Sequence, residues 1–329
     1  IRDRAHYLLG AVEALERDDE RLAAAYRSVN QCPLGACAIT GTAFPIRRER
    51  TAVLLGFEGP TGNTYGSIAT VDHLVEATSA AVVLLVGVGR VVQDLLLWCT
   101  KEVDYLRLAD GFVQTSSIMP QKRNPVALEH ARALASKAFA QLQGVPVAVH
   151  NTPFGDIVDT EDDLQPLVAS AFGDATRAVA LVSAALRGAS LNVARMRERA
   201  GQHGVSITEL ADTLVRDHGV SFRVGHGIAA RMVEALDAGG MSPSDLLRTA
   251  SREVLGREIV LDETTLRRVL SPDHFVEVRR TPGGPSPELV RGAIQVAEVR
   301  LARDRAAHAG RRTALDGADA ARAAALAAL

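Results

Sequence analysis

The most informative part of this 329-residue chain is the polar segment 114–125, which reads Gln-Thr-Ser-Ser-Ile-Met-Pro-Gln-Lys-Arg-Asn-Pro. It brings two hydroxyl groups (Ser116 and Ser117), the ammonium of Lys122 and the carboxamide of Asn124 close together in sequence. Long stretches rich in Ala, Leu and Val flank it and predict helices. Such a set suits a reaction in which negative charge develops on a carboxylate substrate, because catalysis then depends on preorganised donors around that charge.

A helix is expected directly after this loop. Pro125 suits the first helical turn, where its missing N–H costs nothing, and Asn124 is expected to be the N-cap. Residues 126–135 are mostly good helix formers. The N-terminal end of that helix carries partial positive charge beside Lys122, so the loop is predicted to bind an anion.

The serine pair indicates a base. A serine hydroxyl is a weak base until its alkoxide is stabilised, and a nearby cation and helix N-terminus would do so. Lys122, Asn124 and the loop amides would then stabilise the intermediate formed when a C–H proton is removed next to a carboxylate. Each residue alone is ordinary, because Asn-Pro caps many helices and an exposed lysine is usually only solvated. The combination in one loop is what indicates a site.

The loop resembles the signature of the fumarase/aspartase superfamily, S-S-x-M-P-x-K-x-N-P, and its form is most similar to argininosuccinate lyases, with Thr115 where the family usually has Gly. The resemblance implies that Ser116 is the catalytic base and that Glu129 orients a histidine for proton transfer. It implies substrate binding by the remaining loop residues Lys122, Asn124, Ser117 and Met119.

The resemblance covers nearly the whole chain, up to an Ala-rich tail at residues 318–329. Three further regions carry it: Pro33-Leu34-Gly35 with residues 41–46, residues 210–216 with 220–223, and residues 276–280 with Gly283-Gly284-Pro285. It implies an all-α fold with a long-helix bundle and a small helical C-terminal domain. It also implies a homotetramer in which each active site combines segments of three chains.

Two departures from the family pattern stand out. The chain begins at Ile1, and the family's N-terminal domain would precede residues 5–9, so its Arg/Asn and Thr-His segments are expected to be lacking. None of the nine histidines lies in a matching motif, which would leave Glu129 without its partner in this chain. In residues 150–163, His150 stands at a tyrosine position of the family and Asp163 at a lysine position.

The altered segment is acidic. Its carboxylates would favour a cationic amine as leaving group, because opposite charges pair through strong hydrogen bonds. The loss of a lysine that would grip an α-carboxylate is not a conservative change. The acidic residues are Asp159, Glu161, Asp162 and Asp163.

Composition limits the partners. A net charge of −2 without a basic stripe argues against nucleic acid. The longest apolar run, residues 80–89, is too short to span a bilayer, and no secretory signal is visible. Cys32, Cys37 and Cys99 lack metal-site spacing and are expected to be free thiols in a reducing compartment. A cytoplasmic protein with no cofactor, no metal and no membrane partner is predicted.

The helical pattern predicts two domains, a central bundle at 1–188 and a C-terminal domain of shorter helices with an Ala-rich tail at 189–329. Gly87 and Gly89 lie inside a helix, where glycine costs stability, so a close helix crossing is expected there, with a kink as the alternative. The two longest apolar helices carry more hydrophobic surface than one chain covers, which favours a homotetramer. The expected helices are 2–28, 69–100, 125–143, 161–186, 206–217, 224–238 and 242–253.

The leading hypothesis is a C–N lyase that releases fumarate from an N-substituted aspartate by β-elimination, with argininosuccinate as default substrate. A lyase for another succinylated amine, such as ethylenediaminedisuccinate, is the alternative. An inactive or structural family member is a rival of a different class, which the intact set of Ser116, Lys122 and Asn124 opposes. An all-helical binding scaffold is a third possibility.

Overall fold

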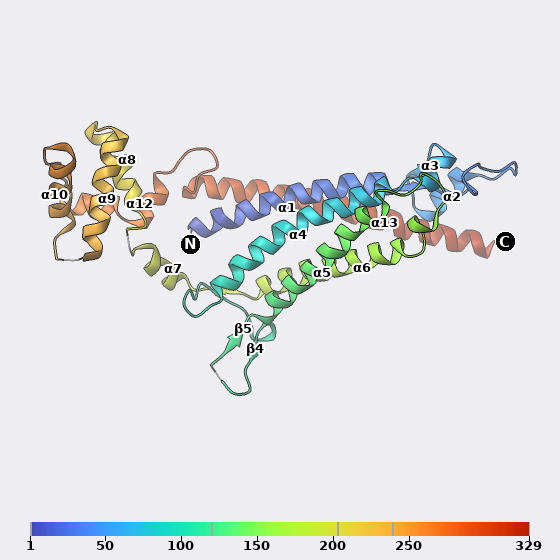
Figure 1. The fold of residues 1–329 in the computed structure, drawn as a ribbon, viewed down its shortest axis with the longest axis horizontal. Helices are drawn as coiled ribbons and strands as arrows, with labels where there is room; N and C mark the ends of the chain where they lie inside the picture. The colour runs from blue at the N-terminus through green and yellow to red at the C-terminus, as the bar shows by residue number, and fades with distance from the viewer. Residues whose placement is uncertain (1, 120, 203, 239, 329) are drawn as a thin grey trace. The chain divides into compact units, whose positions relative to one another are not determined.

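The computed structural model describes residues 2–119, 121–202, 204–238 and 240–328, and these are mostly helical (Figure 1). The prediction of an all-α fold with long helices is confirmed. The α-helices are α1 Arg2–Val29, α2 Arg48–Leu55, α3 Thr64–Ala69, α4 Asp72–Trp98, α5 Val126–Val149, α6 Leu164–Arg187, α7 Val193–Ala200, α8 Ile207–His218, α9 Phe222–Ala238, α10 Pro243–Leu255, α11 Glu263–Val269, α12 Pro272–Glu277 and α13 Pro287–Ala327. The short strands are β1 Gln31–Cys32, β2 Gly59–Pro60, β3 Leu106–Arg107, β4 Gln114–Thr115, β5 Arg123–Asn124 and β6 Ser190–Leu191.

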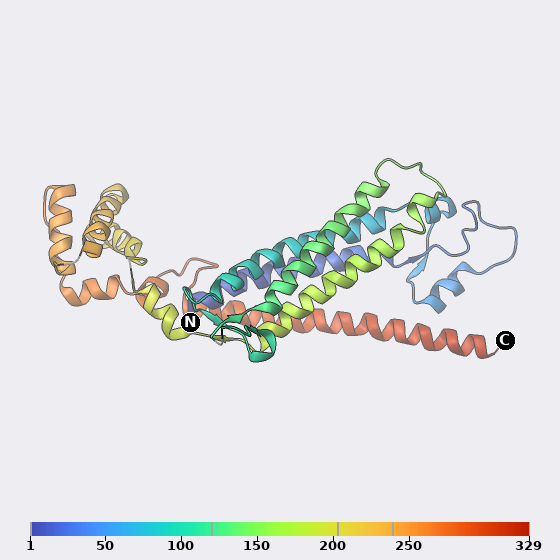
Figure 2. The same cartoon turned by 60° about the horizontal axis from the view of Figure 1, so that its bottom comes forward.

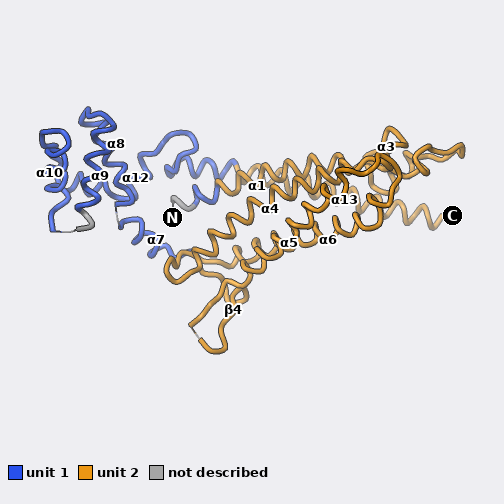
Figure 3. The backbone as a smooth tube through the Cα atoms, in the orientation of Figure 1, with its two compact units in different colours: residues 1–9, 191–296 blue, residues 10–190, 297–329 orange. Residues whose placement is uncertain are grey.

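The chain forms two compact units, coloured separately in Figure 3. One contains residues 1–9 and 191–296, and the other contains residues 10–190 and 297–329. The sequence predicted two domains, 1–188 and 189–329, and this boundary lies close to the change of unit after residue 190. The two divisions differ in the segments 1–9 and 297–329, because helices α1 and α13 each contribute residues to both units.

Helices α4, α5 and α6 pack side by side in the larger unit (Figures 1 and 2). Small side chains at their contacts allow the helices to approach closely, and leucines fill the remaining space. This cluster contains Ala81, Leu85, Ala135, Ala138, Leu142, Ala171, Ala175 and Ala178. A second cluster fixes the end of α4 against the start of α5, and it contains Val88, Val92, Leu95, Leu106, Leu108, Ala127, Leu128 and Ala185.

Helix α13 is longer than the sequence suggested. Shorter helices were expected throughout residues 189–329, but α13 runs for 41 residues and includes all of the Ala-rich tail that the structure describes except its last turn residue. It is joined to α1 by ion pairs between Arg300 and Glu16 (3.1 Å) and between His308 and Asp19 (2.8 Å). The helix was missed because charged residues occur along most of its length and glycines interrupt it at Gly292, Gly310 and Gly317.

Two other helix boundaries correct the prediction. The helix expected at 69–100 is divided, since Thr70 adopts an extended conformation between α3 and α4 while its hydroxyl donates to the Gly66 carbonyl at 2.7 Å. Helix α5 does not stop near Gln143 but continues through Pro146 to Val149. Local propensity predicted an earlier end, but packing of Val145 and Val149 against Leu164 of α6 extends the helix.

The glycines of α4 do not mark a close crossing within the chain. A methyl group added at Gly89 would meet nothing within 4 Å, and one added at Gly87 would lie 3.9 Å from the Asp18 carboxylate, an ordinary contact. The expected close crossing is therefore wrong for a single chain.

Helix α4 and the segment 158–187 are each long and apolar enough to cross a membrane, by length and composition only. The uninterrupted apolar run 80–89 underestimates the apolar length of this helix, because α4 keeps a mean hydropathy of 2.0 over an 18-residue window. The absence of a membrane partner therefore stays a prediction.

The smaller unit is built around α8, α9 and α10, whose buried residues include Leu210, Leu214, Ile228, Met232 and Leu247. Glu209 of α8 is buried among them, with 1% of its surface exposed. Its carboxylate accepts hydrogen bonds from Arg279 Nη1 at 2.7 Å and Arg216 Nη2 at 3.0 Å. The two segments that resembled the family here, 210–216 and 276–280, thus meet at one buried carboxylate.

Candidate functional site

The polar loop 114–125 forms a short hairpin that projects from the helical bundle (Figure 1). Strand β4 pairs antiparallel with β5, and the paired residues are Gln114 with Asn124 and Thr115 with Arg123. The sequence suggested Asn124 as the N-cap of α5, and this prediction is wrong. Pro125 holds that position, and no side chain caps the helix there. Pairing in β5 moves Asn124 one residue away from the helix, so its carboxamide is available for a ligand.

Ser116 lies in the loop between β4 and β5 and is half-buried. Its Oγ accepts hydrogen bonds from the backbone N–H groups of Ile118 (3.2 Å) and Met119 (3.1 Å). The Lys122 N–H donates to the Met119 carbonyl at 3.0 Å and closes the turn. Donors to an oxygen favour its anionic form, so this geometry suits an alkoxide. Pro120, which belongs to the signature, lies outside the described residues.

A hollow of about 620 Å³ adjoins this hairpin. Four of the six residues predicted for the site border it together: Met119, Lys122, Asn124 and Glu129. Ser116 and Ser117 are not among its lining residues. The wall is completed by Gln93, Leu96, Leu97, Cys99, Thr100, Lys101, Glu102, Gln121, Arg123, Pro125 and Arg132.

The wall of this hollow carries more positive than negative side chains. Its cations are Lys101, Lys122, Arg123 and Arg132, and its acids are Glu102 and Glu129. Four cations against two carboxylates favour an anionic ligand.

Several lining residues were missed by the sequence reasoning. Arg132 stands three residues after Glu129, so helical spacing alone would have placed both on one face of α5. Its Nη1 donates to Gln93 Oε1 on α4 at 3.2 Å. Gln93 and Lys101 carried no such signal, because only the packing of α4 against α5 brings them to the loop.

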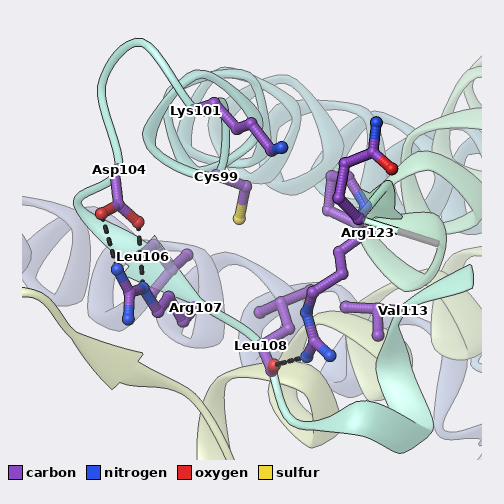
Figure 4. Close-up of a pocket in the computed structure, with 10 residues that line it drawn as sticks. Cys99, Lys101, Asp104, Leu106, Arg107, Leu108, Val113 and Arg123 are labelled. Carbon is purple, nitrogen blue, oxygen red and sulfur yellow. Dashed lines mark hydrogen bonds and ion pairs between the residues drawn. The ribbon is translucent and has the colours of Figure 1, made fainter. Parts of the chain in front are cut away.

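A smaller hollow of about 160 Å³ is lined by Arg123 of the hairpin and by residues between Cys99 and Val113 (Figure 4). Arg107 and Asp104 at its edge form a two-pronged ion pair, with distances of 3.0 Å and 2.7 Å. Cys99 also borders it, and burial raises the pKa of this thiol to about 11. Cys99 is therefore a neutral thiol at physiological pH and a poor nucleophile.

No histidine lines either hollow among the residues that the structure describes. Within the same described ranges, no three His, Cys, Asp or Glu side chains are grouped so that they could hold a metal ion. Glu129 therefore does not meet in these hollows the histidine that the resemblance implied.

The altered segment 150–163 lies at the other end of α5 from the hairpin. A helix of 24 residues spans about 36 Å at 1.5 Å per residue. His150 ends α5, and its Nδ1 lies 3.0 Å from the Val147 carbonyl. A hydrogen bond with the nearby Asp156 carboxyl raises the pKa of Glu161. The hairpin and this segment cannot meet in one chain.

Comparisons with known proteins identify two matching regions of the chain. A profile described as Lyase matches residues 4–140, and one described as Argininosuccinate lyase C-terminal matches residues 205–277. Argininosuccinate lyase 2 of Agrobacterium fabrum is 41% identical over 293 residues, which cover 88% of this chain and 58% of that protein. Argininosuccinate lyase of Methanocorpusculum labreanum is 35% identical over 91% of this chain and 61% of its own length.

Solved structures of related lyases share the fold of this chain. EDDS lyase in complex with formate superposes with a TM-score of 0.88 at 33% identity, over 97% of this chain and 64% of that one. A variant of EDDS lyase has been solved with bound fumarate. A class II fumarase from Schistosoma mansoni, at 16% identity and a TM-score of 0.62, shares the fold. The chain spans about three fifths of the length of the curated relatives that it matches.

Proposed function

The chain belongs to the Lyase family and carries an argininosuccinate lyase C-terminal region, and from this we propose that it is a carbon–nitrogen lyase. The proposed reaction releases fumarate from an N-substituted aspartate by β-elimination, with argininosuccinate as the default substrate. The observation that carries it is the hollow where Lys122 and Asn124 meet in a wall with an excess of cations. A succinyl group supplies two carboxylates that such a wall would bind.

In this proposal Ser116 acts as the base. Its alkoxide would take the proton from the carbon next to a carboxylate, with the Ile118 and Met119 N–H groups stabilising the charged oxygen. Lys122 and Asn124 would hold that carboxylate while negative charge accumulates on it. The C–N bond then breaks, its electron pair leaves with the nitrogen, which takes a proton from solvent, and the amine and fumarate are the products.

A different amine is the second candidate. It is supported by the similarity to EDDS lyase and by Asp163, an acid where the family pattern has a lysine. The segment offers carboxylates rather than a cation to whatever amine leaves.

We also propose that the protein assembles as a homotetramer. Most exposed side chains of α4 form one stripe along the helix, and those near its middle are apolar, so another helix packed there would remove them from water. Near its middle are Val83 and Val86, exposed by 43% and 48%. The stripe comprises Asp72, Glu76, Ser79, Val83, Val86, Arg90, Gln93 and Leu97. Light scattering of Val86→Glu beside the unchanged protein tests this, and a monodisperse monomer for the unchanged protein would contradict it.

The reaction is tested by following the ultraviolet absorbance of fumarate with argininosuccinate and with ethylenediaminedisuccinate in separate arms. Fumarate from the first substrate supports the default, and fumarate from the second alone supports the altered amine. Ser116→Ala should abolish the signal, whereas Ser136→Ala, an exposed serine of α5, should not change it. A folded protein that releases fumarate from neither substrate would favour the inactive family member.

A further inference from the structure

We propose that Arg123 is a positioning residue that fixes the hairpin so that Lys122 and Asn124 face the larger hollow. This inference rests on the proposed function only for what the hollow binds. The hairpin needs such a support, because it has only two residue pairs, Gln114 with Asn124 and Thr115 with Arg123. Two-stranded hairpins are marginally stable by themselves.

Arg123 ties the hairpin to the bundle. Its Nη2 donates to the Leu108 carbonyl at 3.4 Å and pairs with Asp110 Oδ1 at 2.7 Å. Leu108 is only 4% exposed and belongs to the cluster that joins α4 to α5, so this carbonyl is a fixed point. Figure 4 shows the Arg123 guanidinium reaching the Leu108 carbonyl at the edge of the smaller hollow.

The neighbours of Arg123 have different surroundings. Lys122 and Asn124 border the larger hollow and not the smaller one, whereas Arg123 borders both. Successive side chains of an extended segment point to opposite faces. The contacts of Arg123 with Leu108 and Asp110 therefore set the direction in which the Lys122 and Asn124 side chains point.

The expected effect is modest. The side chains of Arg123 and Asp110 are 49% and 90% exposed, so solvent screens their attraction. Exposed pairs of this kind shift an equilibrium by about fivefold at most. Loss of the anchor should therefore weaken binding at the larger hollow by about three- to fivefold.

Two measurements test the inference on the full chain. Hydrogen–deuterium exchange of residues 108–126 reports the hairpin, and calorimetry with fumarate as probe reports the hollow. Arg123→Ala and Asp110→Asn should both speed exchange in the hairpin and weaken fumarate binding to a similar extent, and the double variant should be no worse than Arg123→Ala. Arg123→Lys should recover part of both effects.

Arg107→Ala is the matched control. Arg107 is also an arginine at the edge of the smaller hollow with an acidic partner, Asp104, but it lies on β3 and not on the hairpin. Its removal should leave fumarate affinity within about twofold, below the shift expected from loss of an exposed pair in the hairpin.

The outcomes separate the alternatives. Asp110 borders neither hollow, so an Asp110→Asn variant with normal affinity beside a weakened Arg123→Ala would mean that Arg123 contacts the ligand directly, and the inference would be wrong. Unchanged exchange in Arg123→Ala would also overturn it, whatever the protein binds. If the unchanged protein binds no fumarate but Arg123→Ala still speeds exchange in the hairpin, the proposed function is refuted. The positioning role of Arg123 then remains supported.

Discussion

Replacing Arg279 with alanine should strongly destabilise the smaller unit. Arg279 lies over the Phe275 ring at 3.4 Å, and its Nη1 donates to the Phe275 carbonyl and to Glu209, both at 2.7 Å. The Glu209 side chain is 1% exposed. Removing the arginine would leave the buried carboxylate with Arg216, whose own side chain is 50% exposed, and with the His274 ring at 3.9 Å.

The magnitude follows from these contacts. Removing one partner of a buried ion pair typically costs about 3–5 kcal/mol. Arg216 remains 3.0 Å from the same carboxylate, so the lower end of that range applies. The lost contact with the Phe275 ring adds about 0.5–1 kcal/mol. The free energy of unfolding should therefore fall by about 3.5–4 kcal/mol, a large part of the roughly 5–15 kcal/mol of a typical domain.

Urea unfolding followed by circular dichroism measures this loss, and a separate early transition is expected because the two units have separate cores. Arg280→Ala is the control, since Arg280 is the exposed next residue and donates only to the Glu277 carbonyl among the bonds that the structure gives it. A loss below about 1 kcal/mol in Arg279→Ala, similar to that expected of an exposed pair, would refute the reasoning.

Three further predictions concern the larger unit. Ser116→Ala should abolish fumarate release without changing the helical circular dichroism, because no core cavity forms; retention of most activity would contradict the assignment of Ser116 as base. Gly89→Ala should raise the free energy of unfolding by about 0.5–1 kcal/mol, because the added methyl meets nothing within 4 Å, and a loss in thermal unfolding would show that another copy occupies this space. A hydrogen bond with Lys137 lowers the pKa of Asp174, so their pair stabilises the fold above the carboxyl's ordinary pKa and loses this contribution as the pH falls through the lowered value. Lys137→Met should therefore flatten the acid side of the unfolding midpoint plotted against pH, and an unchanged curve would contradict the pairing.

The sequence predicted those features that depend on local patterns. Helices α1 and α6 were expected within a few residues of their observed ends, because their apolar residues recur at helical spacing. The family resemblance identified Met119, Lys122, Asn124 and Glu129, which the structure places around one hollow. The role of each residue stays a prediction.

Features that depend on tertiary contacts were not predicted. Asn124 was expected to cap α5, but pairing with Gln114 places it in a strand, a contact that local propensity does not contain. Gln93 and Lys101 join the hollow only because α4 packs beside α5. Likewise, the burial of Glu209 depends on arginines from two helix-rich segments that lie far apart in sequence.

The positions of the hairpin and of the altered segment favour a shared site over a site within one chain. They lie at opposite ends of α5, about 36 Å apart. The exposed stripe of α4 ends in Gln93 and Leu97, which line the larger hollow. A second copy packed on that stripe in the opposite direction would bring its own segment 150–163 toward the hairpin of the first. The same contact would cover the exposed Val83 and Val86 and, on the proposed function, would bring acidic groups close to the leaving amine.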